Sequence, residues 1–346
     1  MKDIYVCYAS SDEYAGFTGI SLYSLLENNQ HFPIKKIFIL DYGIKSPNKQ
    51  KLDCVAGKYG LTIEYIESTK TLENFKDILG IQKFSGSFAT YSRAFIDYIM
   101  PDYVRYLLYI DSDTIVTGKI DVILKIDMES SVMAGVIGVN QYPYKNEKHN
   151  PELDLVSGNK KYIACGIVYY DLKNWREYKC NEMIARCCKL NIKMPLADQT
   201  LINNAIPEKL FKELPPEMNY WGHCYPKKRE HREYKRGGWY SDKIIDNMIM
   251  HPIVIHYKGL LYRPWFDGCL SRKKDIYIKY KAMTPWADIP QGSLSQEIKR
   301  KPKNERIHWK IEILISKAPY DWIAQLIQKA KHSMTKILKS GIARKN

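Results

Sequence analysis

The chain has 346 residues and a formal net charge of +15, and 45% of its residues are hydrophobic and 12% aromatic. A chain of this size and composition can bury a large core, which excludes an intrinsically disordered protein. Its longest apolar stretches fall far short of the roughly 18–20 residues that a transmembrane helix needs. The first residues lead straight into a strand pattern, without the basic and apolar regions of a signal peptide. The eight cysteines lack zinc-finger spacing, so we expect free, buried thiols in a cytoplasmic protein.

Strand and helix patterns alternate over the first 110 residues. In chain order, the expected elements are a strand at 2–9, a helix at 16–27, a strand at 35–40, a helix at 48–59, a strand at 61–66, a helix at 90–100 and a strand at 106–110. This alternation predicts an α/β fold with a mostly parallel sheet covered on both faces, where ligands bind beyond the carboxyl ends of the strands. No glycine fingerprint or P-loop follows any of these strands, which argues against dinucleotide-binding and P-loop kinase folds of those types.

The second half of the chain is mixed. The expected elements are a strand at 163–170, a long helix at 172–190, a short helix at 197–205, a basic loop at 225–238 and a buried strand at 253–257. The composition shifts after residues 290–293, and residues 296–346 hold 13 lysines and arginines against four acids. We therefore predict a catalytic domain at 1–290 and a basic helical tail at 291–346.

Two carboxylates, Asp111 and Asp113, follow the buried strand at 106–110. Alternation along an extended backbone points both side chains the same way, and two converging carboxylates repel unless a cation lies between them. Hard oxygen ligands suit Mg²⁺ or Mn²⁺. An ordinary acidic turn after a strand is the alternative interpretation.

His256 ends another apolar strand and is the strongest candidate for a third ligand. One imidazole beside two carboxylates shifts the preference from Mg²⁺ toward Mn²⁺, although a hydrogen-bonded core histidine would give the same pattern. Lys258, Gly259 and Arg263 follow closely, and they supply cations and a close backbone approach for phosphate. A metal with cations at a strand end predicts a pyrophosphate site.

Six collinear segments together resemble the retaining nucleotide-sugar glycosyltransferases of family 8, which include bacterial galactosyl- and glucosyltransferases and glycogenin. The segments are 9–15, 91–93, 109–113, 162–168 with 171–176, Asp198 and Gln199 with Asn203, and 256–259 with 263–265. The order and spacing match over about residues 1–275. The resemblance implies a GT-A, Rossmann-like nucleotide-sugar-binding fold with a mixed sheet, and transfer of galactose or glucose from a UDP-sugar to a glycan or glycolipid acceptor.

The resemblance also assigns roles to residues of this sequence. For the donor nucleotide, it implies a uridine pocket at Ala9, Ser11 and Tyr14 and further donor contacts at Ser112, Lys258, Gly259 and Arg263. It implies a Mn²⁺ site at Asp111, Asp113 and His256, and a sugar or diphosphate contact at Arg93. The donor-sugar loop would be Ala164, Cys165 and Gly166, and the catalytic residues would be Asp198 and Gln199. Ser11 stands where bacterial members usually have aspartate, and Ala164 where they have asparagine. The donor sugar therefore stays open between galactose, glucose and an N-acetylhexosamine.

Retention of configuration requires a nucleophile on the opposite face or front-side attack by the acceptor. Gln199 is an amide and a weak nucleophile, so we favour front-side substitution with its carbonyl near the developing positive charge on the sugar. Asp198 is its neighbour, with a helix N-cap as the alternative interpretation. Two other functions stay open: a catalytically weakened nucleotide-sugar-binding or membrane-surface scaffold, with which Ser11 and Ala164 are compatible, and a metal-dependent nucleotide phosphohydrolase that would use the same acid pair.

The tail has an amphipathic pattern. Apolar residues recur every three or four positions over residues 320–338, and lysines occupy much of the rest. This pattern predicts a helix on an anionic membrane, which would place the protein peripherally at the cytoplasmic face. Packing on the catalytic domain is the alternative. We expect no nucleic-acid partner, because no recognised nucleic-acid-binding module accompanies the basic segments.

Overall fold

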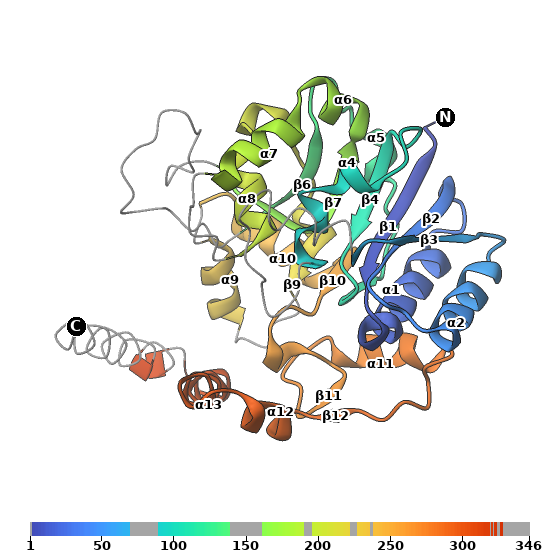
Figure 1. Cartoon of the computed structure of the whole chain (residues 1–346). Coiled ribbons are helices and arrows are strands. Elements are labelled where there is room, and N and C mark those ends of the chain that lie inside the picture. The colour runs from blue at the N-terminus through green and yellow to red at the C-terminus, as the bar shows by residue number, and fades with distance from the viewer. Residues whose placement is uncertain are drawn as a thin grey trace. The chain divides into compact units, whose positions relative to one another are not determined.

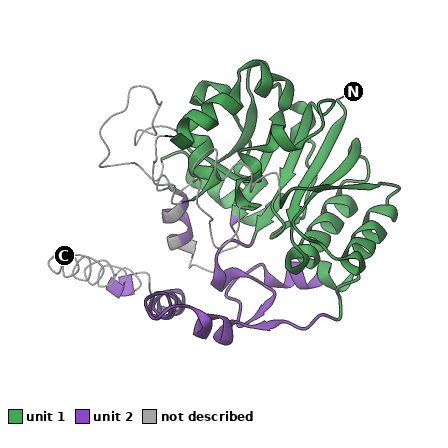
Figure 2. Cartoon of the chain, viewed as in Figure 1, with its two compact units in different colours: residues 1–220, 235–256, 280–288 green, residues 221–234, 257–279, 289–346 purple. Residues whose placement is uncertain are grey.

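The computed structural model describes residues 2–69, 89–138, 161–189, 196–221, 227–235, 238–318, 320, 322–323 and 326–327 (Figure 1). The chain divides into two compact units (Figure 2). The first comprises Met1–Tyr220, Lys235–His256 and Tyr280–Asp288, and the second Trp221–Tyr234, Tyr257–Lys279 and Ile289–Asn346. The boundary near residue 290 stays a prediction.

The first unit contains the large sheet and the helices that cover it. Its strands are β1 (Ile4–Ser10), β2 (Ile34–Asp41), β3 (Ile63–Glu67), β4 (Tyr106–Ile110), β5 (Thr114–Val116), β6 (Met133–Ile137), β7 (Ile163–Asp171), β8 (Phe211–Glu213) and β10 (Val254–His256). Its helices are α1 (Ala15–Asn28), α2 (Ser46–Gly57), α4 (Ile96–Ile99), α5 (Val122–Lys125), α6 (Leu172–Glu177), α7 (Cys180–Lys189), α8 (Asp198–Ala205) and α10 (Asp242–Met250). Four 3₁₀ turns complete the described part: η1 (Asp12–Tyr14), η2 (Ala89–Arg93), η3 (Glu208–Leu210) and η4 (Pro216–Asn219).

The described part of the second unit is mostly helical. It holds η5 (Leu260–Tyr262), β11 (Phe266–Asp267), β12 (Gly292–Ser293), α12 (Leu294–Arg300) and α13 (Lys303–Lys317). Three further elements each contain a point at which the chain passes from one unit to the other: β9 (Tyr220–Trp221), α9 (Lys227–Lys235) and α11 (Lys274–Ala282). Among the described residues, no helix is long and apolar enough to cross a membrane.

The large sheet is mixed, with the strand order β3-β2-β1-β4-β7-β6-β8. Strands β1 to β4 run parallel, whereas β7 runs antiparallel to both β4 and β6. The carboxyl end of β4 therefore lies beside the middle of β7, with Ile110 paired to Ile167. The antiparallel direction of β7 brings the residues near Ile167 to the edge of the sheet where β4 ends.

Successive side chains of a strand point to opposite faces of the sheet. In the central strands of this sheet, the side chains on both faces are apolar. On one face, Val6 and Leu108 pack with α1 and α2. On the other face, Cys7 and Leu107 pack with α6, α7 and α8. Figure 1 shows these helices as two groups on either side of the sheet. A sheet buried on both faces explains why its central strands read as continuous apolar runs.

Three sequence-based elements differ from the structure. The helix expected at 90–100 is the turn η2 followed by the single turn α4, and the helix expected at 172–190 breaks into α6 and α7. Lys179 lies at that break with a φ of 54°, a left-handed conformation that stops a helix. The expected basic loop is wrong over residues 227–235, which form helix α9. Nine residues without glycine or proline favour a helix, but their high charge hides the apolar period that reveals one.

Candidate active site

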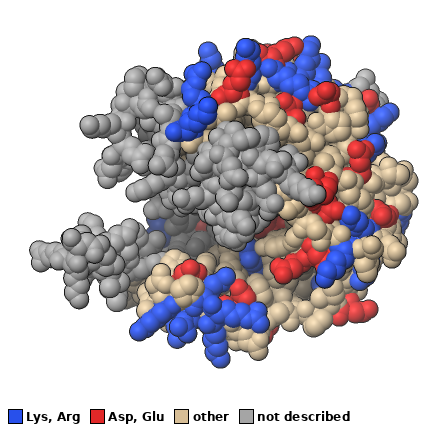
Figure 3. Space-filling view, viewed as in Figure 1, with Lys and Arg blue, Asp and Glu red and all other residues tan. Residues whose placement is uncertain are grey.

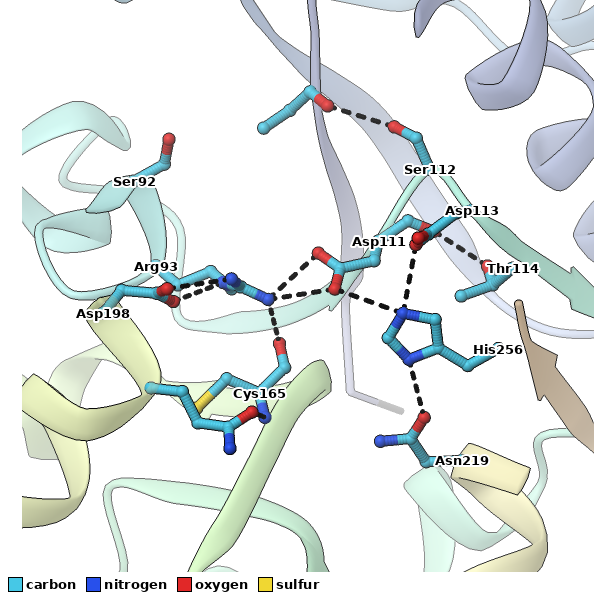
Figure 4. Close-up of polar contacts among 12 residues, drawn as sticks. Ser92, Arg93, Asp111, Ser112, Asp113, Thr114, Cys165, Asp198, Asn219 and His256 are labelled. Carbon is cyan, nitrogen blue, oxygen red and sulfur yellow. Dashed lines mark hydrogen bonds and ion pairs between the residues drawn. The ribbon is translucent and has the colours of Figure 1, made fainter. Parts of the chain in front are cut away.

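Three predicted metal ligands meet at the carboxyl edge of the sheet (Figure 4). Asp111 and Asp113 lie in the turn between β4 and β5, and His256 is the last residue of β10, paired with Thr114. The His256 Nε2 lies 3.0 Å from the Asp113 Oδ1 and 3.7 Å from the Asp111 Oδ2. One ligand atom from each residue falls within 4.8 Å of the others. Two carboxylates and one imidazole at this spacing fit a divalent cation such as Mn²⁺ or Mg²⁺.

Gly166 makes room for this cluster. The Asp111 N–H donates to the Gly166 carbonyl at 2.8 Å, which continues the pairing of β4 with β7 past the end of β4. A Cβ on Gly166 would lie 2.5 Å from two atoms of the His256 ring and 3.2 Å from the Asp111 Oδ2. Only a residue without a side chain lets the β7 backbone approach the ring and the carboxylate this closely.

Helix α1 holds the turn that carries the two aspartates. Three hydroxyls of α1, one turn apart, hydrogen-bond this turn and β5: Thr18 with Ser112 at 2.8 Å, Ser21 with Thr114 at 2.8 Å, and Ser24 with the Val116 N–H at 2.9 Å. The Ser112 hydroxyl also donates to the Ala9 carbonyl at 3.0 Å, and Ser112 is buried. Ser112, predicted to contact the donor, therefore joins the turn to β1 and α1 through its side chain.

Arg93 links the metal cluster to the start of α8. Its Nη1 donates to both carboxylate oxygens of Asp111 at 3.0 Å and to the Cys165 carbonyl at 2.8 Å. Its Nη2 donates to the Asp198 Oδ1 at 2.9 Å. Burial raises the pKa of the Asp198 carboxyl to about 6, and the Arg93 charge opposes that rise. Asp198 is the first residue of α8 and pairs with Arg93, which accounts for its burial better than a helix cap does.

Gln199 and Asn203 fasten α8 to the amino end of β7. The Gln199 Oε1 accepts a hydrogen bond from the Cys165 N–H at 3.1 Å, and the Asn203 Nδ2 donates to the Ile163 carbonyl at 2.9 Å. The predicted donor-sugar loop is thus the amino end of β7, and Ala164 is buried there. Gln199 is 9% exposed, so its amide lies at the boundary of the core.

The remaining predicted residues lie in two places. Ala9 ends the apolar part of β1, Ser11 precedes the η1 turn that follows, and Tyr14 is the last residue of that turn, with an exposed side chain. Lys258, Gly259 and Arg263 belong to the second unit. Within that unit, the Lys258 Nζ lies 4.7 Å from the Trp221 ring and the Arg263 guanidinium 5.5 Å from the Trp265 ring. Gly259 has a φ of 89°, which a side chain would disfavour.

Sequence reasoning missed Asn219, whose Oδ1 lies 3.0 Å from the His256 Nδ1. Nothing around Asn219 in the sequence marks it, because its role depends on how η4 packs against β10. The hydroxyls of α1 were also missed. Their signal was present, since Thr18, Ser21 and Ser24 recur every three residues on the buried side of an otherwise apolar helix.

Comparison with solved structures shows that the fold is that of the GT-A glycosyltransferases. The structure of the galactosyltransferase LgtC in complex with donor and acceptor sugar analogs matches 87% of this chain and 99% of its own, with a TM-score of 0.61 and 18% identity. The bifunctional glycosyltransferase WbbM matches 82% of this chain with a TM-score of 0.65 and 20% identity, and the match spans 50% of that longer chain. The predicted fold class is confirmed.

The sequence then identifies the family. The model of Glycosyl transferase family 8 matches residues 5–269, and the chain belongs to this family. General stress protein A of Bacillus subtilis (strain 168) is 24% identical over 85% of this chain and 98% of its own length. A lipopolysaccharide 1,2-glucosyltransferase of Escherichia coli is 23% identical over 89% of this chain and 87% of its own. The resemblance drawn from the six segments is confirmed at the level of the family.

Proposed function

We propose that the protein is a metal-dependent, retaining hexosyltransferase that moves galactose or glucose from a UDP-sugar to a glycan or glycolipid acceptor in surface polysaccharide biosynthesis. The convergence of Asp111, Asp113 and His256 beside Arg93 carries this proposal, because it places two carboxylates, an imidazole and a guanidinium at one edge of a GT-A sheet. Similarity to the lipopolysaccharide 1,2-glucosyltransferase of Escherichia coli supports the choice of acceptor class.

Charge development during transfer explains the residue types. Breaking the bond to the anomeric carbon leaves negative charge on the nucleotide diphosphate and positive charge on the sugar. A bound Mn²⁺ or Mg²⁺ would stabilise the leaving diphosphate. Arg263 and Lys258 supply further positive charge for the phosphates, and Arg93, which is paired with the buried Asp198, faces the sugar or the diphosphate. Ala9, Ser11 and Tyr14 hold the uridine.

The surroundings of Asp198 and Gln199 support front-side substitution. Asp198 is fully buried and neutralised by Arg93, which makes its carboxylate a poor nucleophile. The Gln199 amide carries no charge, and its Oε1 accepts a hydrogen bond from the Cys165 N–H at the amino end of β7. Gln199→Ala should lower kcat far more than it raises the KM of the donor, as expected for a group that acts in the transition state. A covalent sugar on either residue, detected by mass spectrometry, would overturn the front-side mechanism.

Donor and metal binding give the decisive test. Thermal unfolding is measured with UDP, UDP-glucose, UDP-galactose, UDP-N-acetylglucosamine and GDP-mannose, each with and without Mn²⁺. We expect UDP and one UDP-hexose to raise the Tm only when Mn²⁺ is present. In a separate hydrolysis assay, we expect slow release of the hexose from that UDP-hexose. Asp113→Asn should remove the metal-dependent part of the shift. UDP binding without sugar release would favour a scaffold, and cleavage of the nucleotide phosphates would favour a phosphohydrolase.

We further propose that the tail binds an anionic membrane, and that the enzyme works at the cytoplasmic face. Lys and Arg side chains gather over α12 and α13 (Figure 3). Large apolar side chains are exposed in the same region: Ile307, Leu314, Tyr320, Trp322 and Leu326. Exposed apolar bulk beside positive charge suits an anionic lipid surface. Most of the predicted stripe at 320–338 lies outside the described residues.

A further inference from the structure

Asn219 is a buried amide on the far side of the His256 ring from the two aspartates (Figure 4). It ends the turn η4, and two contacts fix this turn in place. The Met218 N–H donates to the Pro215 carbonyl at 3.0 Å, and the Ile253 N–H, just before β10, donates to the Glu217 carbonyl at 2.8 Å. The turn and the strand that carries His256 are therefore joined by a backbone hydrogen bond as well as by the side chains.

The contact between Asn219 and His256 determines which ring nitrogen carries the proton. The Asn219 Oδ1 lies 3.0 Å from the His256 Nδ1, and a carbonyl oxygen can only accept. The proton of the neutral ring must then lie on Nδ1, which leaves the lone pair on Nε2. Nε2 is the nitrogen that faces Asp113 at 3.0 Å and Asp111 at 3.7 Å. The amide thus selects the tautomer in which the ring can bind a metal between the carboxylates.

Two observations indicate that the amide serves the ring. The Asn219 Nδ2 is buried and finds no hydrogen-bond partner among the residues that the structure describes, so this side chain contributes only its acceptor. The Gly166 backbone lies against the ring edge that bears Cε1 and Nδ1, where even a methyl group would clash. Gly166 limits where the ring can lie, and the Asn219 Oδ1 faces the ring at Nδ1.

We infer that Asn219 is a positioning residue for the metal site: it accepts the Nδ1 proton of His256 and thereby presents Nε2 to the divalent cation. This inference rests on the metal site of the proposed function.

The test measures Mn²⁺ binding to the full-length protein by calorimetry, without nucleotide or acceptor. Asn219→Leu keeps the size of the side chain and removes the acceptor, and we expect its Kd for Mn²⁺ to rise by about 10–100-fold. Asn219→Asp keeps the acceptor and should stay within about threefold of the wild type. Asn204→Leu is the matched control, because Asn204 is equally buried and its amide has no partner among the described residues. It should bind Mn²⁺ like the wild type.

Nitrogen NMR of the wild-type protein makes the test independent of any variant. With ¹⁵N-labelled histidine and saturating Mg²⁺, we expect the His256 proton on Nδ1. A proton on Nε2, or wild-type Mn²⁺ affinity in Asn219→Leu, would overturn the inference. If the wild type binds neither Mn²⁺ nor Mg²⁺, the metal site itself fails, which distinguishes the proposed function from the role of Asn219.

Discussion

Gly166 shows how one missing side chain shapes the site. Its backbone carbonyl accepts from the Asp111 N–H, and its Cα faces the His256 ring. Neither neighbour can move away easily, since Asp111 also bonds Arg93 and His256 also bonds Asn219. A methyl group here would have to displace His256 or Asp111, two of the three predicted metal ligands.

Gly166→Ala should therefore weaken Mn²⁺ binding strongly, by tenfold or more, and abolish donor hydrolysis. The added Cβ would lie 2.5 Å from the His256 ring, a distance that forces the ring to shift. Calorimetry with Mn²⁺ measures the effect. Gly118→Ala is the control, because its Cβ meets the nearest neighbour, Ile253, at an ordinary 3.4 Å. Unchanged Mn²⁺ affinity in Gly166→Ala would contradict the close packing.

Asp198 predicts a pH dependence of stability. Its pKa is about 6 in the folded protein, because burial disfavours the charged form, against 3.8 as the ordinary value. Between these values the folded state binds more protons than the unfolded state, so stability is greatest below about pH 4 and is lost as pH rises to about 6. The loss is on the order of 3 kcal/mol, at about 1.4 kcal/mol for each pKa unit.

Urea unfolding from pH 4 to 7.5, with a chelator present, measures this dependence. Asp198→Asn has no group to titrate, so the stability of the wild type relative to this variant should fall across the window and level off above about pH 6. A constant difference between the two proteins would show that Asp198 keeps an ordinary pKa.

At the scale of elements, α1 is packed without spare room on its buried side. Gly16 and Gly19 of α1 lie under the Trp286 ring, and a Cβ on Gly19 would lie 2.1 Å from a ring carbon. Trp286 is itself 2% exposed, and its Nε1 donates to the Asn48 Oδ1 at 3.3 Å. The glycines let a large aromatic side chain lie directly on the helix backbone.

Gly19→Ala should destabilise the protein by about 1–3 kcal/mol, because overpacking must shift the buried Trp286 ring. The matched control is Gly57→Ala at the end of α2, where a Cβ would have no neighbour within 4 Å. That variant should be neutral or slightly stabilising, since alanine favours a helix more than glycine does. Denaturant unfolding compares the two, and equal stabilities would refute the packing argument.

The elements that could be predicted are those whose burial is visible in the sequence. Strands β1, β2 and β4 are buried on both faces and read as apolar runs, and Asp111 and His256 each stand where such a run ends. Helix α9 was hidden because it lacks an apolar stripe. Asn219 was hidden because a hydrogen bond between residues 37 positions apart leaves no local pattern. The break at Lys179 depends on a backbone conformation that lysine rarely adopts.

At the scale of the whole molecule, the tail that we propose to bind a membrane also packs within its own unit. Within the second unit, Trp309 and Ile313 of α13 pack with Leu294 and Ile298 of α12 and with η5. Ile323 and Ile327 pack with Ile315 and Ala318. Part of the apolar surface that we expected to face lipid therefore forms a core of its own. A truncation after Ala318 keeps the packing of α13 on α12 and η5 and removes Ile323 and Ile327, which belong to the smaller cluster at Ile315 and Ala318.

Removal of residues 319–346 should abolish binding to anionic vesicles and leave hydrolysis of a soluble UDP-hexose within about twofold. Vesicle sedimentation of the full chain should weaken with salt, because the Debye length falls from about 10 Å at 0.1 M to about 3 Å at 1 M. The apolar side chains should leave a salt-resistant part. Vesicles of neutral lipid are the control. Full binding by the shortened chain would place the lipid contact elsewhere.

The hydroxyls of α1 have a consequence for affinity. The η1 turn leads directly into this helix, and Thr18 bonds both Ser10 before that turn and Ser112 between the two aspartates, 94 residues away in the chain. The segment proposed to hold the nucleotide base and the segment proposed to hold the cation are thus preorganised as one body during folding. A ligand that spans both segments then loses little binding free energy to ordering them. Any enhancement of nucleotide affinity by the cation must be matched by an equal enhancement of cation affinity by the nucleotide.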